Sequence, residues 1–436
     1  MKRANLSKGN LIACCIFHTI LFSLLQIIYC DCIWALYVEL KPTFIWGLTY
    51  EDNVTVISKQ QEKQGLHKKP DFSNRYEPAL EFNIEGARVA IRGKTQLRVR
   101  RYFSLKGWDG TDKAYNIESI FKINPRSELN LGAAYSLNTD TERNFTTEQG
   151  VPSGVLVRRS QNITKMYTGI YSYMLSPKGT LGLMFSYSTF STQASSGSPV
   201  YSYMLNYDYI LNTKDSLNVS LGYSNLQFNY TIAEALLNYE LDNYTISTGL
   251  THIFSDTCKL NFSFGLNYSD TTSQNAIFGE DPSTGEQVLV GTESVSNSTT
   301  GTNFDLQLEK KYYHTTFLFT GAQSLYTDPE TGQTYPTRRF GFKMGYDFTE
   351  KLYGSLSWSF FSNNSEAGDY NNRVSIDRQS NYSTLQISYR YKPNINLSLG
   401  YSRAYSENKT DVNNETTSNR IYLQCSFALQ RPFIVR

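Results

Sequence analysis

Apolar and polar residues alternate along most of this chain with a period of two. In the stretch INLSLGYS (395–402) every odd-numbered residue is apolar and every even-numbered residue is small or polar. The stretches LNVSLGYS (217–224) and LNFSFGLNYS (260–269) repeat this pattern. Because successive side chains of a β-strand point to opposite faces, the pattern predicts strands with one apolar and one polar face.

Applied to the whole chain, the same criterion predicts eighteen strands. The tenth is the least regular, because 230–241 either lengthens it or forms a small hairpin of its own. The predicted strands are 36–50, 75–85, 88–103, 113–123, 127–138, 162–175, 179–190, 200–212, 216–229, 243–254, 258–269, 302–312, 314–326, 337–348, 351–362, 380–391, 395–406 and 418–430.

The connections between these strands alternate between short turns and longer polar loops. The longest loops cover 51–74, 139–161 and 270–301, and both chain ends fall on the side of the short turns. Barrels of bacterial outer membranes have an even strand number, short periplasmic turns and longer outer loops. The sequence therefore predicts an all-β fold, a transmembrane antiparallel up-and-down β-barrel of about 18 strands. Closure of such a barrel satisfies every backbone group.

The apolar faces are predicted to contact lipid and the polar faces to line the lumen. The polar face stays polar in nearly every strand, and aromatic residues such as Trp46, Tyr50, Tyr389 and Tyr391 gather toward strand ends. Outer-membrane barrels carry such rings at both membrane boundaries. Membrane lipid and lipopolysaccharide are therefore expected partners.

The first 35 residues differ from the rest. Lys2, Arg3 and Lys8 precede an apolar stretch over 11–28, which is typical of a secretory signal peptide. We therefore expect a signal peptide over 1–35, a barrel over 36–436, and export to the outer membrane of a Gram-negative bacterium. The net charge of +2 gives no reason to expect a nucleic-acid partner.

Charged residues mark part of the predicted lumen wall. The third strand carries Arg88, Arg92, Lys94, Arg98 and Arg100 on its polar face, and the second strand carries Glu77, Glu81 and Glu85. If Gly86 and Ala87 form a two-residue turn, Glu85 faces Arg88 and Glu81 faces Arg92. Lys94, Arg98 and Arg100 then lack an acid directly opposite on the second strand. Further along the chain, Arg339, Lys343 and Arg390 are predicted to point inward, as are Asp305, Glu309 and Asp347.

Two interpretations of these charges remain open. In the first, the charges pair and merely hold the wall and its register together. In the second, the basic side chains form a stripe that guides an anionic or polyhydroxylated solute, because charged linings select permeants.

No catalytic constellation is found in the sequence. It contains no Gly-x-Ser-x-Gly elbow, no His-Glu-x-x-His and no phosphate-binding glycine loop. No histidine pairs with Cys258 or Cys425 at the spacing of a zinc site. We expect a protein that is not an enzyme and that needs no cofactor or metal.

The mature N-terminus carries a longer motif. LKPTFIWGLTYEDNV (40–54) is followed by DFSNRYEPALEFNIEG (71–86). This resembles the outer-membrane β-barrel proteins of exopolysaccharide systems, including the PEP-CTERM-associated type. The residues that carry the resemblance are Pro42, Tyr50, Asp52, Asn53, Asp71 and Pro78. The resemblance covers about 50 residues and assigns no catalytic residue. It implies polysaccharide export, with periplasmic or lipoprotein export components as partners.

The predicted function is thus a channel that conducts an extracellular polysaccharide across the outer membrane. One alternative is a general or solute-specific diffusion porin. The other is a non-conducting structural or adhesive barrel that is plugged by its own loops.

Overall fold

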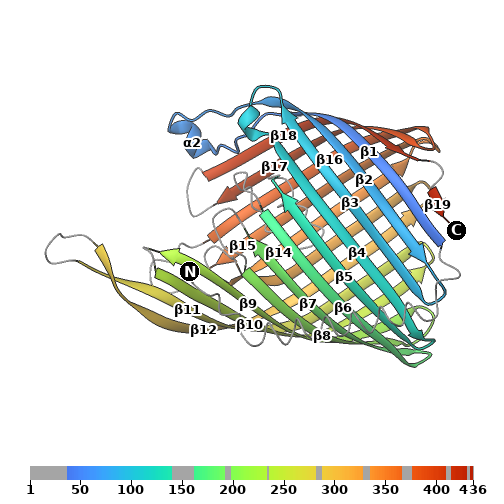
Figure 1. The fold of residues 1–436 in the computed structure, drawn as a ribbon, viewed down its shortest axis with the longest axis horizontal. Helices are drawn as coiled ribbons and strands as arrows, with labels where there is room; N and C mark the ends of the chain where they lie inside the picture. Colours follow the sequence, from blue (N-terminus) through green and yellow to red (C-terminus); the bar gives the residue numbers. More distant parts are fainter. Residues whose placement is uncertain are drawn as a thin grey trace.

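The chain folds into one closed antiparallel β-barrel, seen from the side in Figure 1. This computed structural model describes residues 37–139, 162–191, 198–232, 235–280, 287–327, 334–365, 376–408, 414–429 and 433–435. Every predicted strand has a counterpart in it, so the predicted barrel is confirmed. The predicted signal peptide and the loop over 139–161 lie outside the described residues, apart from Thr139.

Each strand pairs with the next along the chain, and the short segment β19 follows β18 along the edge of β1. The strands are β1 (Tyr37–Glu51), β2 (Asp71–Glu85), β3 (Val89–Tyr102), β4 (Gly110–Asn124), β5 (Ser127–Asn138), β6 (Asn162–Ser176), β7 (Gly179–Ser191), β8 (Ser198–Ile210), β9 (Asp215–Ile232), β10 (Ala235–Ser255), β11 (Cys258–Glu280), β12 (Gln287–Tyr312), β13 (Thr315–Thr327), β14 (Thr334–Asp347), β15 (Leu352–Ser365), β16 (Ile376–Lys392), β17 (Ile395–Asn408), β18 (Asn414–Ala428) and β19 (Phe433–Val435).

The barrel closes between the two ends of the chain. β1 pairs with β2 on one side and with β18 on the other, in a register that runs from Thr43 opposite Ala428 to Glu51 opposite Arg420. Closure leaves the wall without a free edge along this pairing, as a strand surrounded by lipid requires.

Two long hairpins extend the wall where loops or uncertain structure were predicted. The stretch 230–241 lengthens β9 and β10, with Ile232 opposite Ala235, and forms no separate hairpin. The predicted loop over 270–301 is largely strand, because β11 and β12 continue to pair up to Glu280 opposite Gln287. Figure 1 shows this hairpin projecting beyond the other strands, at the end of the barrel opposite to β19. The many Ser, Thr and Asn residues of this stretch predicted a loop. The stretch nevertheless forms a hairpin, because strand pairing uses backbone groups and does not depend on these side chains.

The exposure pattern shows which face of the wall is outside. Along β11 the apolar residues Phe262, Phe264 and Leu266 are 43–48% exposed, whereas the alternating residues Asn267 and Ser269 are buried. The other strands repeat this arrangement, with leucines, tyrosines and phenylalanines on the exposed face. The apolar face is therefore the outer surface and the polar face is the interior, as predicted.

Aromatic side chains form rows across neighbouring strands on the outer surface. Phe185, Tyr203, Tyr223, Tyr244 and Tyr268 stand directly opposite one another on β7 to β11, with ring centroids 5.1–6.3 Å apart. Tyrosine suits a membrane boundary because its ring is apolar and its hydroxyl is polar. A closed barrel with an apolar exterior and aromatic rows has the architecture of outer-membrane β-barrels.

A short α-helix, α2 (Lys59–Lys63), lies in the connection between β1 and β2, and a 3₁₀ turn, η2 (Lys106–Trp108), lies between β3 and β4. Ser58 caps α2, and Gln61 completes a capping box by accepting a hydrogen bond from the Ser58 backbone. Among the described residues, no helix is both long enough and apolar enough to span a membrane.

Candidate lumen site

Charged side chains of the interior concentrate on one wall, formed by β18 and β1 to β4. They are interior because they alternate with exposed apolar residues such as Phe44, Leu80 and Leu97. Opposite charges lie on neighbouring strands: β2 carries acids and β3 carries bases. The sequence predicted this wall, but the structure changes its pairing.

The turn between β2 and β3 lies one residue later than predicted. The Gly86 backbone N–H donates to the Val89 carbonyl over 2.7 Å, so Ala87 and Arg88 form the turn. The predicted pairs of Glu85 with Arg88 and of Glu81 with Arg92 are therefore wrong. Glu85 instead faces Ala90, and Arg88 lies in the turn rather than in the strand.

In the actual register, two of the bases predicted to lack an opposite acid have one. Lys94 faces Glu81, with a distance of 2.9 Å between Nζ and Oε1. Arg98 contacts the Glu77 carboxylate through Nε. Arg92 lies diagonally across from Glu85, with 3.6 Å between charged atoms, and faces Glu118 on its other side. The shift by one turn residue thus converts the stripe of bases into a set of cross-strand ion pairs.

Glu77 is the centre of a buried network. It is 3% exposed and contacts Arg98, Arg75 (3.2 Å) and the Gln96 amide (3.2 Å). Arg98 also lies 4.0 Å from Asp112 on β4, and Asp112 accepts hydrogen bonds from the backbone and hydroxyl of Thr139. A buried carboxylate needs such partners, because removal from water disfavours its charged form.

The network continues across the closure of the barrel. Arg75 donates to Gln424 on β18 over 2.6 Å, and Arg420 on the same strand donates to Glu51 over 3.0 Å. Ser418 donates to the same Glu51 carboxylate. Glu51, Arg75 and Arg420 are not among the residues that the sequence predicted for this wall. Glu51 and Arg420 share the interior parity of their strands, which is the only sequence signal that points to them.

Arg100, Arg339, Lys343 and Arg390 hold interior positions of their strands. Arg100 stands opposite Arg75 in the β2–β3 register. Arg339 and Lys343 alternate with exposed aromatic residues on β14, and Arg390 does so on β16. The structure therefore does not bring the predicted bases into one cluster.

The residues of the N-terminal motif fasten the first loop to the last strand. Asp52 accepts hydrogen bonds from the backbone and the side chain of Asn419, at 2.7 and 2.6 Å. Asn53 is fully buried and bonds to the Ile57 backbone and to the Thr417 carbonyl. We call this arrangement of Asp52 and Asn53 against β18 the clasp.

Asp71 and the aromatic residues of the same motif order the neighbouring end of β2 and β3. The Asp71 carboxylate accepts from the backbone N–H groups of Phe72, Ser104 and Leu105. The Tyr50 and Phe72 rings lie 4.9 Å apart on the outer surface. The motif thus orders the loop end of the barrel, where β1 closes against β18.

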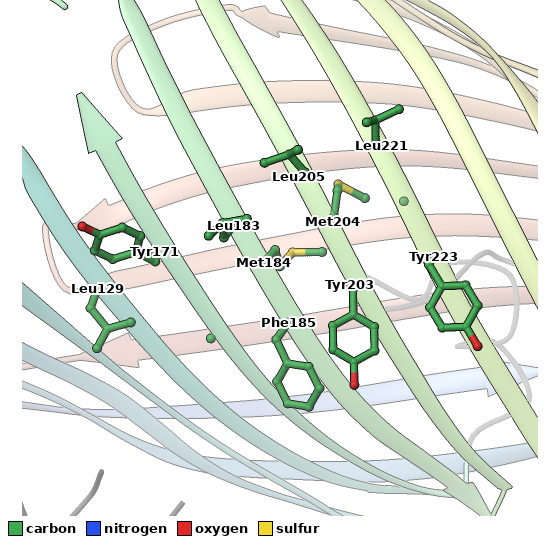
Figure 2. Close-up of a pocket in the computed structure, with 12 residues that line it drawn as sticks. Leu129, Tyr171, Leu183, Met184, Phe185, Tyr203, Met204, Leu205, Leu221 and Tyr223 are labelled. Carbon is green, nitrogen blue, oxygen red and sulfur yellow. The ribbon is translucent and has the colours of Figure 1, made fainter. Parts of the chain in front are cut away.

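A shallow groove of about 580 Å³ lies in the wall of β5 to β9 (Figure 2). Most of its lining is on the outer surface, including Leu183, Leu205 and Leu221. Figure 2 shows Tyr203 and Tyr223 side by side with their hydroxyls pointing the same way. Because this groove is apolar and faces outward, it suits lipid chains better than a polar solute.

Within the described ranges, no group of three or more His, Cys, Asp or Glu side chains is placed to hold a metal ion. The one close histidine–acid pair there joins His252 and Asp215 over 2.6 Å at the short-turn end of β9 and β10. Its position on the rim suggests a role in ordering the turn.

No family model and no curated protein matches the sequence. Among solved structures, the chain is similar to the outer membrane protein OpdK from Pseudomonas aeruginosa, with 10% identity and a TM-score of 0.45 over 89% of this chain and 99% of that one. For the outer membrane channel DcaP of Acinetobacter baumannii the values are 11%, 0.45, 91% and 98%. For the ferric-catecholate import receptor Fiu of E. coli K12 they are 9%, 0.49, 90% and 82%. Similarity at this level carries no function over to the chain.

Proposed function

We propose that this barrel is an outer-membrane channel that conducts an extracellular polysaccharide out of the cell. Its passage requires no bond to be made or broken, so the protein is proposed not to be an enzyme. What the barrel supplies is a hydrated path, weak contacts with many hydroxyl and amide groups, and a balanced electrostatic environment.

The observation that carries this proposal is the polar interior of an eighteen-stranded barrel. Barrels of 16–18 strands leave an aqueous channel, whereas eight-stranded ones are filled by side chains. Interior positions of β15 to β18 are rich in serine, including Ser380, Ser398 and Ser402. These serines are buried, and two of them bond within the wall, Ser380 to Ser406 and Ser398 to Ser388. They make the interior polar while offering no strong binding group to a solute.

The N-terminal motif supports the choice of a polysaccharide. Its resemblance to exopolysaccharide-system barrels rests on the residues that form the clasp and the ordered end of β2. Under this proposal, the chain carries a signal peptide over 1–35, resides in the outer membrane with lipopolysaccharide around it, and meets a polysaccharide-export lipoprotein or periplasmic component at its short-turn end.

A diffusion porin is the second candidate, and the ion-paired wall of β2 and β3 favours it. Paired charges keep a wall in register and leave a broadly polar lumen that admits many small solutes. A plugged structural or adhesive barrel is the third candidate.

Conductance and polymer release together distinguish the three. The purified barrel is inserted into planar bilayers, and secreted polysaccharide is measured in cells with and without the gene. A conducting barrel whose loss abolishes polymer release supports the proposal. Conductance with unchanged release favours the porin, and absence of conductance favours the plugged barrel.

A further inference from the structure

The charged wall of β2 and β3 faces, across the lumen, a wall whose middle part carries mainly amide and hydroxyl side chains. In a ring of eighteen strands, β11 and β12 follow β2 and β3 by nine places, which is half of the circumference. Asn267 is nine residues after the start of β11 at Cys258, and Arg98 is nine residues after the start of β3 at Val89. Because all strands share one tilt, equal distances from the short turns correspond to similar heights in the barrel.

Amide and hydroxyl groups occupy neighbouring interior positions of β10, β11 and β12, next to the interior Asp305. Thr245 faces Asn267, and Asn243 faces Ser269, between β10 and β11. Asn303 of β12 faces Gly265. We call Asn243, Thr245, Ser247, Asn267, Ser269 and Asn303 the amide patch.

Two side-chain oxygens of the amide patch have no hydrogen-bond partner in the described part of the chain. They are Oδ1 of Asn267, which is 5% exposed, and Oδ1 of Asn303. By contrast, the neighbouring Asn243 accepts from the Ser269 hydroxyl over 3.1 Å. A buried acceptor without a donor is unfavourable. Both oxygens are inaccessible as they stand, so the two amides have to rotate toward the lumen before a hydroxyl-bearing molecule can supply the donor.

One acid and one base stand near the amide patch. Asp305 and Arg339 flank it on β12 and β14, each directly opposite Ala322 of β13. Across the lumen, Arg98 and Lys94 are paired with Glu77 and Glu81. The fields of Lys94 and Arg98 and of their paired acids largely cancel away from the wall, so these two bases attract an anionic polymer little.

We propose that the permeant is a neutral glycan, whose hydroxyls donate to Asn267 and Asn303 as it passes the amide patch. This inference rests on the proposed channel function and deepens it, because it names the class of polysaccharide. An acidic polymer meets the Asp305 carboxylate beside the amide patch, and the bases Lys94 and Arg98 opposite to it already pair with Glu81 and Glu77.

The test uses the purified full-length barrel in planar bilayers, with a linear neutral hexaglucoside and a hexagalacturonate of the same length added in turn. The neutral sugar is expected to interrupt the current, and the acidic one to do so much less. Asn267→Ala with Asn303→Ala is expected to weaken the neutral blockade about tenfold, since two hydrogen bonds are lost. Asn396→Ala, on the interior face of β17, is the matched control and is expected to leave the blockade unchanged.

Each result has a defined meaning. A conducting barrel that favours anions, or that the acidic sugar blocks more strongly, overturns the inference and leaves the channel function intact. A neutral blockade that survives in the double variant overturns the assignment to the amide patch. Absence of conductance overturns the channel function and the inference together. The comparison of the two sugars on the unmodified barrel decides the question even if the double variant does not fold.

Discussion

Arg420 donates a hydrogen bond of 3.0 Å to Glu51 across the closure of the barrel, although the two residues are 369 positions apart in the chain. Both side chains are interior and nearly inaccessible, with 11% and 6% of their surface exposed. Their contact joins the last strand to the first at the loop end of the barrel.

Glu51→Ala leaves the Arg420 guanidinium buried without its carboxylate. Breaking a buried pair from one side typically costs about 3–5 kcal/mol, and we expect a loss of that size in the free energy of unfolding. Urea unfolding of the barrel in lipid vesicles measures it. Lys41→Ala, on the same strand but with a half-exposed side chain, is the control and is expected to change little. A Glu51→Leu, Arg420→Met double variant is expected to recover part of the loss; equal stability of all variants would show that the pair does not hold the closure.

Phe262 and Ser263 are neighbours in β11 that point to opposite sides of the wall. Phe262→Arg places a charge among lipid chains and is expected to cost about 2–4 kcal/mol if it lies near the bilayer midplane. Ser263→Arg places the same charge in the interior, opposite Asp305, and is expected to cost far less. The same unfolding assay compares them. Equal penalties would contradict the assignment of the two faces.

The projecting hairpin of β11 and β12 is expected to lie outside the cell. In a background that carries Cys258→Ser and Cys425→Ser, Ser294→Cys should react with a membrane-impermeant maleimide on intact cells. Thr349→Cys, in the short turn before β15, should react only after the outer membrane is permeabilised. The reverse pattern would place the short turns outside and invert the topology.

The clasp is expected to protect the first loop from proteases. Asn53→Ala removes the bonds to Ile57 and Thr417, at a cost of about 1–3 kcal/mol for the groups left unpaired. It also frees Val56, whose φ of 53° is unfavourable for a β-branched residue. Trypsin on intact cells should then cleave after Lys63, as followed by mass spectrometry.

Gln60→Ala, in the short helix of the same loop, is the control for the clasp. It is expected to leave cleavage after Lys63 as slow as in the unmodified protein. Rapid cleavage in the unmodified protein would mean that the clasp does not order the loop.

Removing positive charge from the paired wall is expected to shift ion selectivity. Arg98→Glu with Arg100→Glu adds acids beside Glu77 and Asp112, and the resulting field should favour cations. Reversal potentials in a salt gradient measure the shift, which should shrink at high salt because charges are screened over about 8–10 Å at physiological ionic strength. An unchanged reversal potential at low salt would mean that this wall does not border the conducting path.

The alternation of residues along the chain determined the strands and their faces by itself. A period of two can be satisfied only by extended backbone, and it separates the lipid face from the interior without any knowledge of partners. The order of short and long connections then predicted the antiparallel barrel. Residue composition predicted a loop over 270–301, and this was wrong for most of the stretch. Its polar residues form a hairpin because strand pairing depends on backbone groups.

Only the tertiary structure decided which charges meet. A turn at Ala87 and Arg88 instead of Gly86 and Ala87 gave every residue of β3 a new partner on β2, and no local preference separated the two turns. The contact of Glu51 with Arg420 depends on closure of the ring, which joins positions that no periodicity relates. The amide patch also exists only because β10, β11 and β12 align in one register, since hydrogen-bond partners across strands are set by backbone pairing and not by the order of residues within a strand.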